Sequence, residues 1–122
     1  MQMTEIQNTK HYNLEDRTLE FAKKVRLFVK KLSRTISNIE DGKQLVKSSG
    51  SIGANYIEAN ESFSKKDFVM RIKICRKEAK ESRYWLRLVE ISNKSLERER
   101  DGLIQEVTEL MKIFGSIVEK SK

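Results

Sequence analysis

One face of small and apolar residues repeats without a break through the third quarter of the chain. Its members are Phe68, Ile72, Cys75, Ala79, Ser82, Leu86 and Val89. They are spaced alternately four and three residues apart, which keeps them on one side of an α-helix and is typical of left-handed coiled packing. Ser64 and Asp67 resemble a capping box before this segment, with Asp in the place of the usual Glu or Gln. The spacing predicts a helix over 65–92.

Three further stretches show a similar spacing and predict helices over 14–37, 42–61 and 96–119. Asp41 and Gly42 supply the turn chemistry expected between the first two of these helices. The chain has no proline, and its β-branched residues never alternate with polar residues over a useful length. No strand is therefore predicted.

The predicted connections between these helices are short, which makes neighbouring helices antiparallel. We expect an all-α protein that folds as an antiparallel up-down-up-down left-handed four-helix bundle. The bundle would occupy residues 14–122 as a single domain, after a flexible N-terminal tail over residues 1–13.

The charge of the chain indicates which partners suit it. There are 25 Lys and Arg residues against 18 Asp and Glu, a net charge of +7, which favours RNA, DNA or an acidic protein. The single cysteine cannot form an internal disulfide, and no apolar run is long enough to span a membrane or to act as a signal peptide. We expect a cytoplasmic protein that makes no contact with a membrane.

The side chains that carry most enzyme chemistry are scarce in this sequence. His11 is the only histidine and falls in the predicted tail, so the Glu and His ligand pairs of a metal-binding bundle cannot form. Cys75 belongs to the apolar face and has no histidine nearby to make it a thiolate. Gly50 and Gly53 lack the spacing of a phosphate-binding loop, and we interpret them as positions where another backbone packs closely. The sequence predicts a protein with no metal, no cofactor and no enzymatic activity.

The candidate nucleic-acid-binding residues lie on one face of the helix predicted over 65–92. They are Lys66, Lys73, Lys77, Lys80, Tyr84 and Arg87, flanked by Arg76 and Arg83. Like charges four residues apart destabilise a helix, so their repetition indicates a surface that follows phosphates, with Tyr84 as a stacking platform. An ordinary solvated face and a docking surface for an acidic protein are the alternatives.

The same helix carries a second stripe that is one residue out of phase with the first. Its members are Ile74, Glu78, Glu81, Trp85 and Leu88. The first predicted helix shows the same excess in Phe21, Leu27 and Phe28, and the last shows it in Ile104, Met111 and Val118. Burial of such residues between copies would stabilise an association by about 25 cal/mol per Å², so we expect a homo-oligomer. The alternative is that these residues widen the core of a single chain.

The two acidic residues of this second stripe also allow two interpretations. In an oligomer, Glu78 and Glu81 would need Arg or Lys partners from an adjacent helix or subunit. As exposed residues, they would pair with nearby basic side chains on their own helix.

Three motifs in the middle of the chain resemble a known family. They read Ser-Ile-x-x-Asn-x-x-Glu-Ala from Ser51, Ser-Lys-x-Asp-Phe from Ser64 and Lys-Glu-Ala-x-Glu-Ser-Arg-Tyr-Trp-Leu from Lys77. Over about residues 14–118, the chain resembles the four-helix-bundle proteins encoded in intervening sequences of bacterial large-subunit ribosomal RNA. The resemblance implies an antiparallel four-helix bundle that assembles as a ring-like homopentamer, and it supplies no catalytic residue.

Residues that match these motifs are interpreted as architectural or as part of an oligomer interface. They are Ser51, Asn55, Glu58, Asp67, Phe68, Glu78, Glu81 and Trp85. On the inner face of its helix, the Asn55 amide would fix one alignment among several, with Glu58 as its neighbour. More loosely, the chain resembles accessory proteins of diversity-generating retroelements, which are basic pentameric bundles that bind nucleic acid. By analogy this favours binding of RNA or another nucleic acid, and the alternative function is a protein–protein interaction scaffold with no nucleic-acid role.

Overall fold

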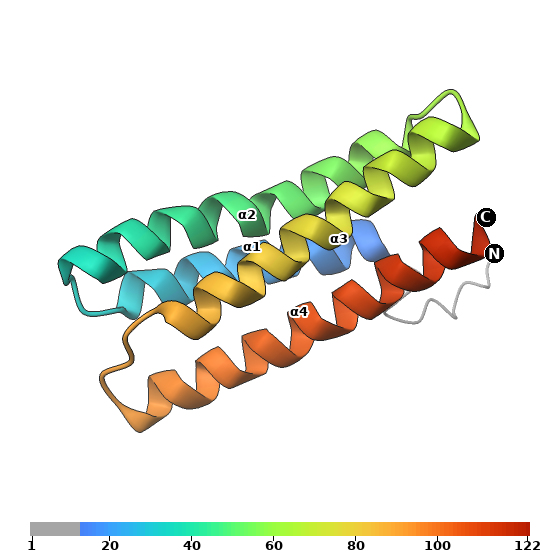
Figure 1. Cartoon of the computed structure of the whole chain (residues 1–122). Helices are drawn as coiled ribbons and strands as arrows, with labels where there is room; N and C mark the ends of the chain where they lie inside the picture. The colour runs from blue at the N-terminus through green and yellow to red at the C-terminus, as the bar shows by residue number, and fades with distance from the viewer. Residues whose placement is uncertain (1–12) are drawn as a thin grey trace.

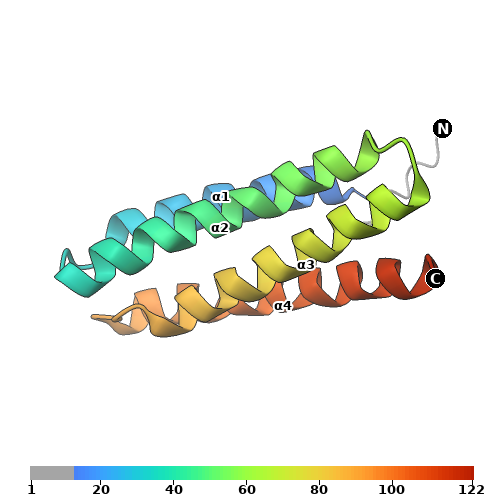
Figure 2. The ribbon, with the colours of Figure 1, turned by 45° about the horizontal axis from the view of Figure 1, so that its top comes forward.

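The computed structural model describes residues 13–122, which form four α-helices and no strand. The helices are α1 (Leu14–Lys31), α2 (Ile36–Asn60), α3 (Lys65–Leu88) and α4 (Lys94–Lys120). Figures 1 and 2 show long rods lying side by side, each running in the opposite direction to the one before it. α4 contacts α1 as well as α3, which closes the bundle. The predicted all-α four-helix class is confirmed, and the left-handedness of the bundle stays a prediction.

Each helix begins at a polar residue whose side chain accepts a hydrogen bond from a backbone N–H in the first turn. These residues are Asn13, Thr35, Ser64 and Asn93. Such caps satisfy donors that the helix itself leaves unpaired. Residues 1–12 of the predicted tail, including His11, lie outside the described part of the chain.

The junction between the first two helices was predicted in the wrong place. α1 ends at Lys31 rather than at residue 37, because Leu32 adopts an extended conformation. α2 begins at Ile36 rather than at residue 42, because the Thr35 hydroxyl accepts a hydrogen bond from the Asn38 N–H at 3.1 Å. Gly42, which we had taken for a helix breaker, lies buried inside α2, where a Cβ atom would lie 3.2 Å from Val29 Cγ1. Close packing between α1 and α2, and not a turn, explains this glycine.

The ends of the last two helices also differ slightly from the prediction. α3 begins at Lys65 as predicted but ends at Leu88, because Val89 is extended, rather than continuing to residue 92. α4 begins two residues earlier than predicted, at Lys94, because the Asn93 side chain accepts a hydrogen bond from the Leu96 N–H at 2.9 Å.

The core follows the apolar faces of all four helices. On α3 the buried residues are Ile72, Cys75, Ala79, Ser82 and Leu86. Phe21 and Phe28, which we had expected at an oligomer interface, are 1% and 0% exposed inside the single chain. They lie on the same side of α1 as Val25, so they belong to the wider apolar stripe of a helix in a globular core. For these two rings, the alternative of a widened monomer core is therefore correct, whereas Leu27 of the same helix is 56% exposed.

The small residues of α2 let its neighbours approach closely on both sides. Toward α1, a Cβ atom on Gly53 would lie 2.8 Å from Thr18 Oγ1. Toward α3, the buried Ser48 and Ser82 hydroxyls are hydrogen-bonded at 2.9 Å. Gly50 and Gly53 thus lie within a helix, and the close packing predicted for this stretch is confirmed at Gly53.

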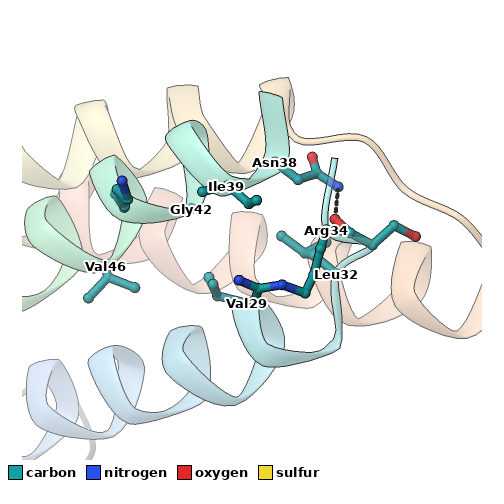
Figure 3. A pocket seen from close by; sticks show the side chains of 9 residues that line it. Val29, Leu32, Arg34, Asn38, Ile39, Gly42 and Val46 are labelled. Atoms are coloured by element: carbon teal, nitrogen blue, oxygen red, sulfur yellow. Dashed lines mark hydrogen bonds between the residues drawn. The ribbon is translucent and has the colours of Figure 1, made fainter. Parts of the chain in front are cut away.

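A buried amide joins two connections at one end of the bundle. Asn38 is 3% exposed, and its Nδ2 donates to the carbonyl oxygens of Ser33 at 3.0 Å and Glu90 at 3.1 Å. Its Oδ1 accepts from the Glu90 N–H at 2.8 Å. Asn38 also lines a pocket of about 400 Å³ between the end of α1 and the start of α2. Figure 3 shows Asn38 among the side chains around this pocket. One side chain therefore ties the α1–α2 connection to the α3–α4 connection.

Candidate nucleic-acid interface

Most of the candidate residues on α3 lie opposite its buried stripe and face away from the core. Seven of the eight candidate residues are exposed: Lys66, Lys73, Arg76, Lys77, Lys80, Tyr84 and Arg87. Arg83 is half-buried. We call Lys66, Lys73, Lys77, Lys80 and Arg87 the cationic row; at 1.5 Å per residue it extends about 32 Å along the helix.

The charges of this row are not neutralised within the chain. Within residues 13–122, the only ion pair that a member of the row makes joins Lys77 Nζ to Glu78 Oε2 at 4.0 Å. Lys73 and Lys80, four and three residues from Lys77, reinforce its positive field instead of balancing it. The surface therefore keeps the single sign that attracts polyanions.

The two flanking arginines turn toward α4 and are partly engaged there. Arg83 Nη1 donates to the Thr108 hydroxyl at 3.3 Å. The Arg76 side chain runs over Gly115, where a Cβ atom would lie 3.7 Å from Nη1. Arg83 thus serves packing between α3 and α4, whereas Arg76 remains exposed at the edge of the row.

Tyr84 lies on the same face of α3 as the cationic row, and the residue is 58% exposed. The ring centroids of Tyr84 and Trp85 are 4.9 Å apart, and the two planes meet at 76°. This edge-to-face arrangement is a favoured aromatic geometry.

The second stripe of α3 faces the neighbouring part of α2, and together they form a surface that we call the α2/α3 seam. On α3 it contains Ile74, Glu78 and Trp85, which are half-buried, and Glu81 and Leu88, which are exposed. On α2 it contains Ser51 and Asn55, which are half-buried, and Glu58, which is exposed. The structure thus gathers on one face most of the residues predicted to be architectural or interfacial.

The Asn55 amide of the seam has two hydrogen-bond partners, one of which the sequence analysis did not predict. Asn55 Oδ1 accepts from Arg71 Nη1 at 3.0 Å, and Asn55 Nδ2 donates to the Ser51 carbonyl at 2.8 Å. The partner of the amide is therefore Arg71 on α3, and not Glu58. The only signal for this contact in the sequence is that Arg71 lies next to Ile72, a residue of the core stripe.

Glu78 lies in the least favourable electrostatic position of the seam. Partial burial, followed by the nearby Glu81 carboxylate, raises the pKa of Glu78 above its ordinary value. Lys77 and Lys47 oppose the shift without cancelling it. Ionised Glu78 is thus incompletely compensated within one chain.

Residues 10–116 match the sequence model of the 23S rRNA-intervening sequence proteins. The chain belongs to this family. A solved relative is a protein of unknown function from the S23 ribosomal protein family of Bacteroides thetaiotaomicron, with 33% identity and a TM-score of 0.75. The match covers 85% of this chain and 96% of the other. None of the curated proteins matches this chain.

Six of the eight residues that carry the resemblance to the intervening-sequence proteins lie on the α2/α3 seam. The two others lie at the start of α3. Asp67 is in its first turn, and Phe68 is half-buried and packs against the core of the same chain. For Phe68, an architectural interpretation fits better than an interfacial one.

A groove between α1 and α4 was not predicted. Its volume is about 1010 Å³, and Phe21, Leu27 and Leu103 are among its apolar lining residues. Arg17 crosses it to Glu106, with Nε–Oε2 and Nη2–Oε1 distances of 2.7 and 3.0 Å. Charges of both signs line the groove, so it suits a polyanion less well than the cationic row does.

The side chains with metal or nucleophile chemistry do not converge in the described part of the chain. Residues 13–122 contain no group of three His, Cys, Asp or Glu side chains placed to hold a metal ion. Burial raises the pKa of the Cys75 thiol to about 12, which keeps it protonated at neutral pH. Among these residues no helix has the length and apolar character needed to cross a bilayer.

Proposed function

We propose that this family member is a non-enzymatic, homo-oligomeric helical bundle that binds RNA or another nucleic acid through the cationic row of α3. The observation that carries the proposal is the row itself. Its five cations share one exposed face and, within residues 13–122, make one ion pair, at 4.0 Å.

The energetics of the row favour a polyanionic ligand over solvent alone. Like charges at a spacing of four residues destabilise a helix by about 0.2–0.5 kcal/mol per pair. A phosphate backbone would reverse the sign of these contributions and release its condensed counterions on binding. The mixed charges of the α1/α4 groove offer no such gain.

Salt-dependent RNA binding tests this function. Fluorescence anisotropy of a labelled RNA would be measured over a range of salt concentrations for the wild type and for a variant with Lys73, Lys77, Lys80 and Arg87 changed to Glu. We expect the variant to bind the RNA much more weakly, and the magnitude of the slope of log K against log salt to fall by roughly 3 if each of the four residues meets one phosphate.

A matched control separates the row from the overall charge. Changing Lys23, Lys24, Lys30 and Arg34 to Glu makes the same change in net charge at exposed positions elsewhere. We expect this control to retain most of the binding. Equal losses in both variants would contradict the proposal, and absent or salt-insensitive binding by the wild type would favour a protein-interaction scaffold.

The assembly part of the proposal is supported by the apolar residues that remain on the α2/α3 seam. Trp85 and Ile74 are half-buried and Leu88 is exposed, beside the incompletely compensated Glu78. Contact with another copy would remove this apolar surface from water. The resemblance to intervening-sequence proteins suggests a homopentamer.

Sedimentation velocity tests the assembly. We expect the wild type to be oligomeric at micromolar concentration and the Ile74→Glu, Leu88→Glu double variant to dissociate. Leu27→Glu changes a similarly exposed leucine outside the seam and is the control. A monomeric wild type, or dissociation by the control alone, would contradict assembly through the seam.

A further inference from the structure

Tyr84 is the one aromatic side chain of α3 that combines high exposure with a place in the cationic row. The residue is 58% exposed, whereas its neighbour Trp85 is half-buried. Lys80 lies four residues before it and Arg87 three residues after it, so both project from the same side of the helix. A ring at this position is bordered by cations along the helix axis.

The Tyr84 ring is also oriented by a contact within the chain. Its centroid lies 4.9 Å from that of Trp85 in an edge-to-face pair at 76°. Trp85 in turn packs against the hydrophobic core. The contact with Trp85 therefore restricts the orientation of the exposed Tyr84 ring, which reduces the conformational entropy lost when a flat ligand covers the ring.

We propose that Tyr84 is a base-stacking site, and that the ligand of the cationic row is a single-stranded nucleic acid. This inference rests on the nucleic-acid binding proposed above. Phosphates would lie along Lys77, Lys80 and Arg87, while an unpaired base stacks on the Tyr84 ring. In a duplex every base face except those at the two ends is already stacked on a neighbour, so along its length only a single strand can use the ring.

Electrostatic attraction alone would favour a duplex over a single strand. A duplex presents more phosphates per unit length than a single strand, and each contact with it contributes more to the salt slope. A purely electrostatic row therefore binds a duplex at least as tightly as a strand. Tighter binding of the strand requires a contribution from its bases.

The experiment compares an RNA strand of about 12 nucleotides, within the usual range of single-strand sites, with the duplex that it forms with its complement. Fluorescence anisotropy at equal salt would give the dissociation constants of the full chain for both. We expect the strand to bind more tightly. Tyr84→Ala should weaken strand binding by roughly 5- to 150-fold, the range for one lost base stack, and leave duplex binding unchanged.

Two further variants distinguish stacking from loss of apolar surface. Tyr84→Phe keeps the ring and should retain strand binding. Met70→Ala removes an apolar side chain of similar exposure, 51%, from the same helix and should have little effect. Circular dichroism would confirm that each variant is folded.

The outcomes separate this inference from the function on which it rests. If neither RNA binds in a salt-dependent way, the proposed function itself fails. If both bind but the duplex binds as tightly as the strand, or Tyr84→Ala binds the strand like the wild type, the row is an electrostatic surface and the stacking site is refuted.

Discussion

Replacing the buried Asn38 by alanine should destabilise the bundle more than any other single loss of an amide. The side chain makes three hydrogen bonds, to the carbonyl groups of Ser33 and Glu90 and from the Glu90 N–H, at 2.8–3.1 Å. Alanine would leave these three backbone groups without their partner. At about 1 kcal/mol for each net hydrogen bond, the free energy of unfolding should fall by about 3 kcal/mol.

This loss should be visible in thermal unfolding. With an unfolding entropy of about 2.1 cal/mol/K per residue, the 110 residues of the described part unfold with about 0.23 kcal/mol/K, so 3 kcal/mol lowers Tm by about 13 °C. Circular dichroism at one fixed protein concentration would measure it, because the Tm of an oligomer depends on concentration.

Asn60→Ala is the matched control for this prediction. Asn60 is an exposed residue at the end of the same helix, so its loss should change Tm by only a few degrees or less. A Tm for Asn38→Ala close to that of Asn60→Ala would refute the reasoning. It would mean that water reaches the two connections and replaces the amide without cost.

Three other perturbations give opposite or selective effects. Gly53→Ala should lower the free energy of unfolding by about 1–3 kcal/mol, because its Cβ would lie 2.8 Å from Thr18 Oγ1. Gly102→Ala is the control: a Cβ there would have nothing within 4 Å, so the free energy of unfolding should rise by about 1 kcal/mol. A Gly53→Ala variant as stable as the wild type would contradict the close packing of α2 against α1. Because burial raises the folded-state pKa of Glu78, the wild type loses stability as pH rises through that pKa. Glu78→Gln should therefore raise Tm at pH 7 but not below the ordinary carboxyl pKa of 4.5, and a lower Tm at pH 7 would instead reveal a cationic partner. Cys75 should react with a thiol reagent only as fast as the protein unfolds, since its thiol is buried with a pKa of about 12; rapid labelling of the folded protein would contradict this.

The parts of the fold that the sequence predicted well are those with a local periodic signal. The start of α3 was correct because Ser64 caps it and the heptad spacing begins at Phe68. The α1–α2 junction was wrong because glycine has two uses that look alike in a sequence. Gly42 permits close approach of α2 to Val29, whereas the actual start of α2 depends on the cap at Thr35.

The parts of the candidate site that the sequence missed depend on contacts between distant residues. The basic face of α3 follows from helical periodicity alone, so its exposure could be predicted. The α1/α4 groove depends on Arg17 meeting Glu106, 89 residues away, and the Asn55 amide depends on Arg71 on another helix. Neither contact affects the spacing of residue types along the sequence, so both can be identified only from the packed helices.

The distribution of apolar residues also changes the argument for assembly. A strict heptad count treats every apolar residue outside two positions per repeat as surplus, and on that count Phe21 and Phe28 needed a second copy. In a compact bundle of four helices the apolar stripe of each helix is wider, and both rings are accommodated in the core. Whether an apolar residue needs a second copy must therefore be judged by whether the packed bundle leaves its side chain exposed. On α3 those at the seam are Leu88 and, in part, Ile74 and Trp85, and these residues carry the case for the oligomer proposed above.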